Sequence, residues 1–376
     1  MTTKKLKIMT ILGTRPEIIR LSRILPKMDR FFDHTIVFTK QSYDFELSDI
    51  FFRGLKLRKP DFILDVKSET LGGQIANIIK DSEKIINKVS PDAVLILGDT
   101  NSSLSAINAK RIHIPIFHME AGNRSFDWDV PEEVNRRIVD HISDYNLCYT
   151  KHAKTYLLRE GIEPKNIFVT GSPLSEVFDY FRKDIDSSKV LEDLKLDPKK
   201  YFLVSTHREE NVDNENRLEK LFNSFEGLVE KYNFPVLVSL HPRTKKRLEE
   251  QKIKVGPKII LSKPLGYIDY CKLQKNAYCT LSDSGTVQEE SAILDFPAIQ
   301  IRVSTERPEA FDKGTIILTG FNKDSILNAI DLTVSVRNDG EKTVMPEDYK
   351  DLNVSTKVVK LIMGLSGIAK FESRKI

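Results

Sequence analysis

The stretch "FHMEAGNRSFDWDVPEEVNRRIVDH", residues 117–141, joins a strand-like apolar run to a helix-like segment. The apolar run starts at Ile114, and Pro131 suits the opening of a helix because its fixed backbone angle fits the first turn. Glu120 follows the apolar run directly, and Glu132 lies at the start of the helix. A carboxylate at the end of a strand and another in a helix's first turn can face one cleft. The stretch therefore predicts a strand, loop and helix whose acids serve one site.

The same alternation of strands and helices continues through the rest of the chain. Short runs rich in β-branched residues are separated by amphipathic segments such as "LGGQIANIIKDSEKIINKV" at 71–89. Continuous apolar strands that alternate with helices indicate a parallel sheet covered on both faces. The predicted strands are 7–13, 34–39, 93–98, 114–119, 145–150, 167–171, 201–207, 235–241, 258–264, 277–283, 297–303 and 315–320.

A charged stretch at 179–200 interrupts this alternation, which then resumes. We therefore predict an α/β fold made of two doubly wound Rossmann-like domains that face a cleft. The N-terminal domain covers 1–175 and carries the acids, the C-terminal domain covers 176–354, and a helix at about 355–376 is expected to pack back on the first domain. Ligands of such sheets bind outside the carboxyl ends of the strands, so the strand ends are the places to search for a site.

The composition excludes several classes of protein. Hydrophobic residues make up 40% and charged residues 30% of the 376 residues, as in soluble globular proteins. The formal charge of +4 and the lack of a basic block give no case for a nucleic-acid partner. The first apolar run is too short for a signal peptide or a membrane span. The three cysteines form no CxxC pair, so we expect no zinc site or disulfide framework, and a cytoplasmic location.

The strand ends carry the residues that suggest chemistry. "GTRPE" follows the first strand, where Gly13 permits close backbone approach and Arg15 projects at the turn. No strand is followed by GxGxxG or a Walker loop, which disfavours a nicotinamide or ATP enzyme. Ser284 and Gly285 lie at a strand-to-helix turn, where backbone amides and the helix dipole attract phosphate.

Structural interpretations of the same residues remain open. At the strand end, Asp99 or Thr100 is suited equally to a helix N-cap. Glu132 could pair with Arg136 along one helix, or simply favour the positive helix N-terminus. His118 is predicted to be a core histidine rather than a base. His241 suits either a cleft or a strand-end cap, and Trp128 suits either a lid or a packing anchor.

Six motifs in this order resemble the non-hydrolysing UDP-N-acetylglucosamine 2-epimerases: "GTRPEIIR", "GDTNSS", "HMEAGNR…PEEVNRR", "THREE", "DSGTVQEE" and "STERPEA". The resemblance implies a GT-B type fold, a UDP-sugar substrate, no metal or other cofactor, and a homodimer. It implies catalytic roles for Asp99, Glu120, Glu132, Arg136 and His207. It implies substrate or UDP binding by Arg15, Arg20, His241, Ser284, Gly285, Glu290 and Arg307.

The family's reaction interconverts UDP-N-acetylglucosamine and UDP-N-acetylmannosamine, precursors of surface polysaccharides, through elimination and re-addition of UDP. Arg20 in place of lysine, Tyr43 in place of histidine, Thr286 in place of glycine and a short loop before Glu132 resemble a branch that makes UDP-N-acetyl-L-fucosamine. That branch acts on a UDP-2-acetamido-2,6-dideoxy-L-talose. A GT-B glycosyltransferase that uses a UDP-sugar is the alternative from another class, because it shares the fold and a ribose-binding glutamate.

Overall fold

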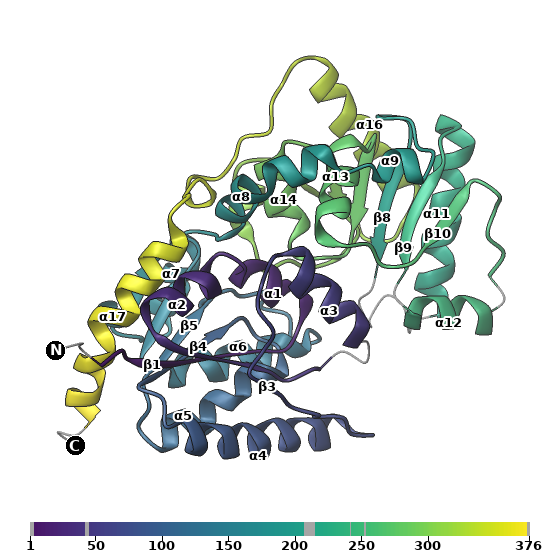
Figure 1. The fold of residues 1–376 in the computed structure, drawn as a ribbon. Coiled ribbons are helices and arrows are strands. Elements are labelled where there is room, and N and C mark those ends of the chain that lie inside the picture. Colours follow the sequence, from purple (N-terminus) through teal and green to yellow (C-terminus); the bar gives the residue numbers. More distant parts are fainter. Residues whose placement is uncertain (1–3, 42–44, 207–214, 241, 252, 374–376) are drawn as a thin grey trace. The chain divides into compact units, whose positions relative to one another are not determined.

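The structure, a computed structural model, describes residues 4–41, 45–206, 215–240, 242–251 and 253–373 (Figure 1). The chain divides into two compact units. Unit 1 comprises Met1–Asp179 together with Asp348–Ile376, and unit 2 comprises Tyr180–Glu347. Each unit contains one parallel sheet with helices between its strands. This architecture confirms the predicted α/β class with two Rossmann-like sheets.

The sheet of unit 1 has the strand order β3-β2-β1-β4-β5-β6-β7, with every neighbouring pair parallel. The chain adds strands on one side of β1 and then returns to build the other side from β4. Six strands match the predicted runs, whereas β3 was not predicted because its two residues are too short for a pattern. The strands are β1 (Lys7–Leu12), β2 (Asp33–Phe38), β3 (Phe62–Ile63), β4 (Ala93–Leu97), β5 (Ile116–Met119), β6 (Tyr145–Cys148) and β7 (Ile167–Val169).

Helices cover both faces of this sheet, as its two-sided apolar strands require (Figure 1). In β1 and β4, Met9, Ile11, Val94 and Ile96 are fully or almost fully buried in one apolar cluster with residues of α4 such as Ile78. The helices are α1 (Arg15–Leu21), α2 (Ile24–Phe31), α3 (Phe45–Gly54), α4 (Leu71–Val89), α5 (Ala106–Arg111), α6 (Pro131–Ile142) and α7 (Lys151–Arg159), with the short 3-10 helices η1 (Asn101–Ser105) and η2 (Pro164–Asn166). Helix α8 (Leu174–Ser187) begins in unit 1 and ends in unit 2.

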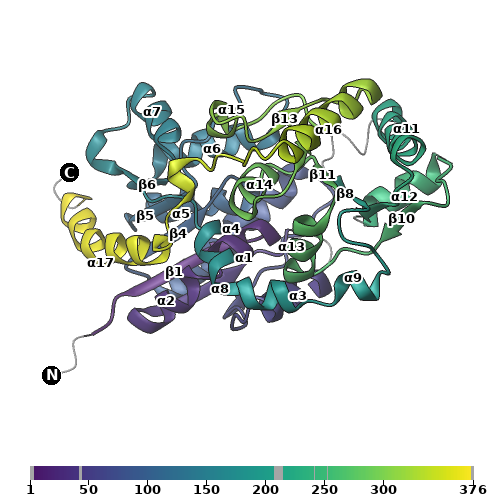
Figure 2. The same cartoon turned by 90° about the horizontal axis from the view of Figure 1, so that it is seen from above.

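The last helix, α17 (Val354–Ser373), packs on α2 of unit 1 (Figures 1 and 2). Lys27 Nζ donates to Thr356 Oγ1 at 2.7 Å, and the Ser355 amide donates to Glu176 Oε2 at 2.8 Å. Ile362 is fully buried on the same helix. The C-terminal segment therefore completes the unit that the N-terminal segment begins.

The sheet of unit 2 repeats the arrangement with the order β10-β9-β8-β11-β12-β13, again parallel throughout. Its strands are β8 (Phe202–Thr206), β9 (Val236–Leu240), β10 (Ile259–Ser262), β11 (Cys279–Ser282), β12 (Ala298–Gln300) and β13 (Ile317–Leu318). Its helices are α9 (Val190–Asp193), α11 (Glu215–Tyr232), α12 (Pro242–Glu250), α13 (Tyr267–Asn276), α14 (Val287–Leu294), α15 (Pro308–Asp312) and α16 (Lys323–Asn338). The 3-10 helix η3 (Glu347–Tyr349) marks the return of the chain to unit 1. Helices α11 and α16 lie side by side (Figure 2).

The strand order reverses between β1 and β4 in unit 1 and between β8 and β11 in unit 2. Loops diverge to opposite faces at such a reversal, which leaves a crevice at the carboxyl ends of the two strands. The predicted site residues that follow β1, β4 and β11 are therefore at the positions where this topology binds ligands. Among the helices in the described residues, none has the length and apolar character needed to cross a membrane.

Candidate active site

The turn after β1 is held by Glu17, a residue that the sequence analysis did not single out. Glu17 Oε2 accepts hydrogen bonds from the backbone amides of Gly13 and Thr14, the latter at 2.9 Å. Glu17 Oε1 accepts a bond of 2.6 Å from the Thr100 hydroxyl, at the end of β4. The spacing of Thr14 and Glu17 is that of a capping box, a sequence signal that could have identified the residue.

Burial raises the pKa of Glu17 to about 7, and the nearby charge of Asp99 adds to this effect. The hydrogen bonds from Gly13, Thr100 and Thr14 oppose the shift. Glu17 is 2% exposed, so it is placed to organise the loops after β1 and β4 rather than to contact a ligand.

Asp99, directly after β4, pairs with Arg136 of α6. Asp99 Oδ2 accepts bonds from Arg136 Nε at 2.9 Å and from Arg136 Nη2 at 2.6 Å. Of the two residues that the sequence offered as a helix N-cap, Thr100 occupies the N-cap position of η1, and Asp99 does not. The Asp99 side chain is 23% exposed, while that of Arg136 is 6% exposed. A ligand can therefore reach the carboxylate while the guanidinium stays beneath it.

Glu120, directly after β5, pairs with the buried Arg20 of α1 at 3.1 Å. The Arg20 guanidinium also lies over the Tyr149 ring, 5.2 Å from its centroid. Glu120 has a φ of +62°, a left-handed conformation that costs a non-glycine residue about 1–3 kcal/mol. A Cβ at Gly98 would lie 3.6 Å from Glu120 Oε2, which places this carboxylate against the end of β4. Asp99 and Glu120 thus gather at neighbouring strand ends.

Glu132 lies in the first turn of α6, as predicted, and is half-buried. Its neighbour Glu133 is fully buried and bonds to Arg136 at 3.1 Å and to Arg137 at 2.9 Å. Glu133 therefore forms intrahelical pairs with two arginines of α6. Glu133 Oε2 also accepts from the Ser125 amide at 3.1 Å, which ties down the loop before α6.

His118 of β5 is a buried core histidine, as predicted, but it belongs to an ion-pair network. Its Nδ1 lies 2.9 Å from Asp140 Oδ1, and its Nε2 lies 2.8 Å from the carbonyl oxygen of Gly98. Asp140 Oδ2 accepts from Arg124 Nη1 at 2.6 Å. Arg124 in turn bonds Glu160 through Nε at 2.8 Å and Nη2 at 2.6 Å. The partners are far apart in sequence, so no local pattern shows this network.

Trp128 lies over Arg137, with the guanidinium carbon 5.0 Å from the ring centroid. Phe126 contacts the same guanidinium at 5.9 Å and the Tyr156 ring edge-on at 5.3 Å. Trp128 is 65% exposed and Phe126 61% exposed. The loop before α6 is therefore anchored to the helix by Arg137, and both aromatic residues present one face to solvent.

In unit 2, Ser284 and Gly285 lie in the turn between β11 and α14, as predicted. The Ser284 hydroxyl lies 3.0 Å from that of Thr286, which donates to Glu290 Oε1 at 2.9 Å. The other oxygen of Glu290 accepts a bond of 2.6 Å from Gln274 Nε2. Glu290 is therefore held in position by neutral groups at the first turn of α14.

Arg307 is 2% exposed and supports the same turn from behind. Its Nε donates to the Gly285 carbonyl at 3.1 Å, and its Nη2 lies 3.2 Å from Glu289 Oε2. Arg15, at the start of α1 in unit 1, is half-buried and lies over the Phe51 ring at 5.8 Å. Among the predicted residues, His207 and His241 lie outside the described residues, as does Tyr43.

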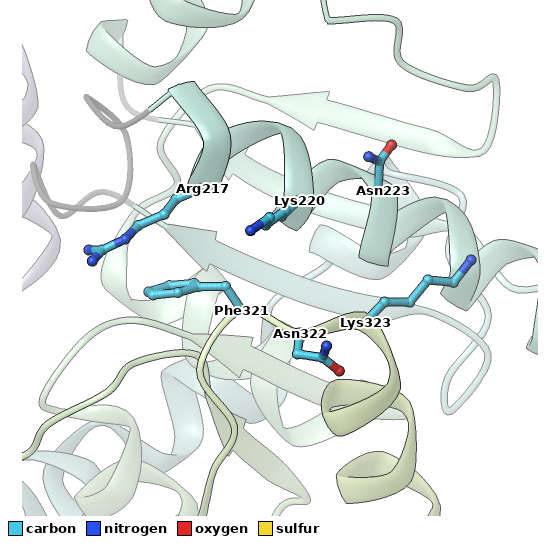
Figure 3. Close-up of a pocket in the computed structure, with 6 residues that line it drawn as sticks. All are labelled: Arg217, Lys220, Asn223, Phe321, Asn322 and Lys323. Carbon is cyan, nitrogen blue, oxygen red and sulfur yellow. The ribbon is translucent and has the colours of Figure 1, made fainter.

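A hollow of about 360 Å³ opens elsewhere in unit 2, between the start of α11 and the turn before α16 (Figure 3). Arg217 extends over Phe321, with its guanidinium carbon 5.2 Å from the ring centroid, and links the two elements. The lining residues are Arg217, Lys220, Asn223, Phe321, Asn322 and Lys323, and none of them is a predicted site residue. Within the described parts of the chain, no group of three or more His, Cys, Asp or Glu side chains is placed to hold a metal ion.

Comparison with known proteins gives consistent matches over nearly the whole chain. The family model described as UDP-N-acetylglucosamine 2-epimerase matches residues 26–363. The protein of that name from Methanocaldococcus jannaschii is 40% identical over 340 residues, which cover 88% of this chain and 93% of that protein. The structure of UDP-N-acetylglucosamine 2-epimerase from Rickettsia bellii is similar with a TM-score of 0.89 and 44% identity, covering 97% of this chain and 98% of that one. A Methanocaldococcus jannaschii UDP-GlcNAc 2-epimerase in complex with UDP-GlcNAc and UDP has a TM-score of 0.89 and 37% identity, covering 96% of this chain and all of that one.

Proposed function

Because the chain belongs to the UDP-N-acetylglucosamine 2-epimerase family, we propose that it interconverts UDP-N-acetylglucosamine and UDP-N-acetylmannosamine. The observation that carries this proposal is the pair of carboxylates at neighbouring strand ends. Asp99 and Glu120 are each partly exposed, and each is supported by its own buried arginine. Inversion at one carbon needs groups that handle a proton on either face of the sugar, and this arrangement supplies two.

The chemistry of the reaction explains why carboxylates and cations are enough to catalyse the epimerisation. The proton on the carbon bearing the N-acetyl group is too weakly acidic for a carboxylate to remove alone. Its removal is therefore coupled to cleavage of the bond from C1 to UDP, and the electron pair forms the double bond of a 2-acetamidoglycal. UDP then adds back as a proton arrives on the other face. Asp99, Glu120 and Glu132 serve as the acid and base groups of this scheme.

Binding of UDP is assigned to unit 2. The turn at Ser284 and Gly285 precedes α14, and backbone amides at a helix N-terminus favour the negative charge of a diphosphate. Glu290 is a charged acceptor suited to ribose hydroxyls. His207 and His241, together with Arg15 and Arg20 of unit 1, complete the proposed set. We further assign the protein to the cytoplasm, as a homodimer that uses no cofactor. Light scattering tests the dimer by measuring the mass of the protein in solution.

Product analysis in heavy water without an acceptor tests the proposal. We expect UDP-N-acetylglucosamine to be converted into UDP-N-acetylmannosamine, with deuterium only on the carbon bearing the N-acetyl group. A glycosyltransferase would leave the sugar unchanged, and a hydrolysing epimerase would release UDP with free N-acetylmannosamine. Epimerised product without solvent deuterium would overturn the proton-abstraction scheme.

The substrate is resolved by competition within a panel of UDP-N-acetylhexosamines. The two main candidates are UDP-N-acetylglucosamine and UDP-2-acetamido-2,6-dideoxy-L-talose, and they are offered together as competing substrates. The second candidate was suggested by the natural residues Arg20 and Thr286, which differ from the common family pattern. Proton NMR of the mixture reports which sugar is turned over. Turnover of UDP-N-acetylglucosamine alone contradicts the L-fucosamine branch and leaves the epimerase proposal standing.

A further inference from the structure

The ion pairs around Asp99 form one continuous series in which charges alternate. Starting from His118, the series passes through Asp140, Arg124 and Glu160 with contacts of 2.9, 2.6 and 2.6 Å. Glu160 continues it to Arg137 at 3.3 Å, and Arg137 continues it to Glu133 at 2.9 Å. Glu133 bonds Arg136 at 3.1 Å, and Arg136 bonds Asp99 at 2.6 Å. We call these eight side chains the charge ring.

The series closes on itself through the backbone. His118 Nε2 lies 2.8 Å from the carbonyl oxygen of Gly98, the residue before Asp99. The amide of Gly98 donates to the carbonyl of Met119 at 3.0 Å. Both the amide and the carbonyl of Gly98 are therefore hydrogen-bonded to residues of β5. The first and last members of the charge ring therefore meet at one short segment, Gly98–Asp99.

The contacts of His118 favour a positive charge. Nε2 is hydrogen-bonded to the Gly98 carbonyl, which can only accept, so Nε2 carries a proton. Nδ1 makes no aligned hydrogen bond but lies 2.9 Å from a carboxylate oxygen of Asp140, and an unprotonated nitrogen there would set its lone pair against a negative charge. Only the imidazolium has two N–H groups. With His118 charged, four cations balance the four carboxylates of the charge ring.

The surroundings of His118 agree with this charge state. Burial alone lowers the pKa of His118, but the close contact and charge of Asp140, the hydrogen bond to the Gly98 carbonyl and the charge of Asp99 offset it, and the pKa lies above its usual value. Asp140 is faced by His118 and Arg124, which hold the pKa of Asp140 below its usual value despite burial. Burial raises the pKa of the Cys148 thiol beside Asp140, so that the thiol is neutral.

Asp140 also holds in place the turn after β5, which carries Glu120. The amide of Gly122 donates to both oxygens of Asp140, at 3.2 and 3.3 Å. This turn contains Glu120, whose φ of +62° needs support from its surroundings. One buried carboxylate therefore connects the turn of Glu120 with the strand end of Asp99.

We propose that His118 is a permanently charged imidazolium and that, with Asp140, it is a positioning pair that fixes Asp99 and Glu120 for the reaction. Neither residue touches the substrate. The kinetic part of this proposal rests on the proposed epimerase function, whereas the charge state does not.

The charge state is tested on the intact protein by nitrogen NMR of its histidine rings. The signal of His118 is identified by its loss in His118→Gln. At pH 8, above the usual histidine pKa of about 6.5, we expect His118 to remain doubly protonated in the wild type. We expect Asp140→Asn to lose this state. A singly protonated His118 ring in the wild type at pH 8 overturns the proposal, whatever the protein catalyses.

The positioning role is tested by kinetics on Asp140→Asn. We expect kcat to fall about tenfold to a hundredfold, the effect of misplacing reacting groups by about 1 Å, while KM changes less than about threefold. The remaining activity should decline further as the pH rises through the range where the unpaired His118 loses its proton. A pH-independent loss, or a change confined to KM, contradicts the positioning role.

The matched control is Lys110→Met, which removes the exposed pair of Lys110 with Asp144 at 2.7 Å in the same unit. We expect its kcat and pH profile to equal those of the wild type. If Asp140→Asn does not fold, His118→Gln is measured in its place, because glutamine can still donate to the Gly98 carbonyl but carries no charge. A His118→Gln protein with wild-type kcat at all pH values overturns the proposal.

Discussion

The two units share one strand order but differ in what they place at the strand ends. In unit 1 the ends of β4 and β5 carry ion pairs, such as Asp99 with Arg136 and Glu120 with Arg20. In unit 2 the described residues around the end of β11 combine neutral and charged contacts. Gln300 Nε2 donates to the Ser284 carbonyl at 3.2 Å, and the buried Arg307 lies 3.2 Å from Glu289.

The difference shows that topology locates a site while the side chains decide its chemistry. Breaking one partner of a buried ion pair leaves an uncompensated charge, which costs about 3–5 kcal/mol, so a charged network stays fixed. Neutral hydrogen bonds contribute about 1 kcal/mol each and exchange partners more readily. Unit 1 is thus suited to hold two partly exposed carboxylates still as reacting groups, whereas the turn at Ser284 and Gly285 of unit 2 presents hydroxyl and backbone groups to which a ligand can bond.

The largest expected effect is on catalysis in unit 1. Asp99→Asn and Glu120→Gln should each lower kcat by roughly a hundredfold or more, because positioned acid and base groups contribute that much. Coupled detection of UDP-N-acetylmannosamine measures the rate, and calorimetry with UDP measures binding. The control Asp144→Asn changes a carboxylate that pairs with Lys110 at the surface and should leave the rate unchanged. If weaker UDP binding explained the whole loss of rate, these acids would act in binding rather than catalysis. That result would contradict the assignment of catalysis to unit 1 and of UDP binding to unit 2.

The second effect is on the pH dependence of stability through Glu17. Because its pKa rises from 4.5 to about 7 on folding, the folded state binds a proton more tightly than the unfolded state. The stabilisation is fully present below about pH 4.5 and is lost as the pH rises through 7. In the wild type, the contribution of Glu17 to the free energy of unfolding falls by about 2–3 kcal/mol between pH 5 and pH 8.

Glu17→Gln tests this term, since glutamine mimics the protonated carboxyl by donating to Thr100 and accepting from Thr14. The difference in free energy of unfolding between wild type and variant should change by the same amount over this pH range, as measured in urea. A difference that stays constant from pH 5 to pH 8 would show that the Glu17 carboxyl does not titrate there. Glu83→Gln, at an exposed position of α4, is the control.

The third effect is on ligand binding in unit 2. Glu290→Ala should weaken UDP binding by about 1.5–3 kcal/mol, the usual contribution of hydrogen bonds to a charged group. Titration calorimetry measures the change, and Glu249→Ala, an exposed acid of α12, provides the control. Unchanged affinity together with a reduced kcat would place the role of Glu290 in catalysis and contradict the division of labour.

The smallest effect concerns Trp128. Trp128→Ala should lower the free energy of unfolding by about 0.5–1 kcal/mol, because an exposed cation–π contact with Arg137 contributes no more. Thermal unfolding measures this loss, and Leu71→Ala, another exposed apolar residue, is the control. A large increase in KM without loss of stability would instead identify Trp128 as a residue that covers the sugar.

The sequence predicted the fold well because fully buried parallel strands leave continuous apolar runs, as in Ala93–Leu97 of β4. It also placed Asp99, Glu120 and Ser284 at strand ends, since those positions follow directly from the runs. The role of Asp140 was not predicted, because its partners His118 and Arg124 are distant in sequence. Glu17 was missed although its capping-box spacing is a local signal, while its bond to Thr100 is not local. The role of Glu133 was also missed. Glu133 and Glu132 are adjacent, and only packing decides which one turns inward.

The return of the chain to unit 1 has a consequence for its synthesis. The surface of α2 that α17 covers stays uncovered until the ribosome has made Tyr180–Glu347 and the helix after it. At about 5–20 residues per second, that delay is roughly 10 to 40 seconds. During this time unit 2 can fold first, although it begins later in the chain. Nascent unit 1 is therefore the part of this protein that most needs protection from aggregation while translation continues.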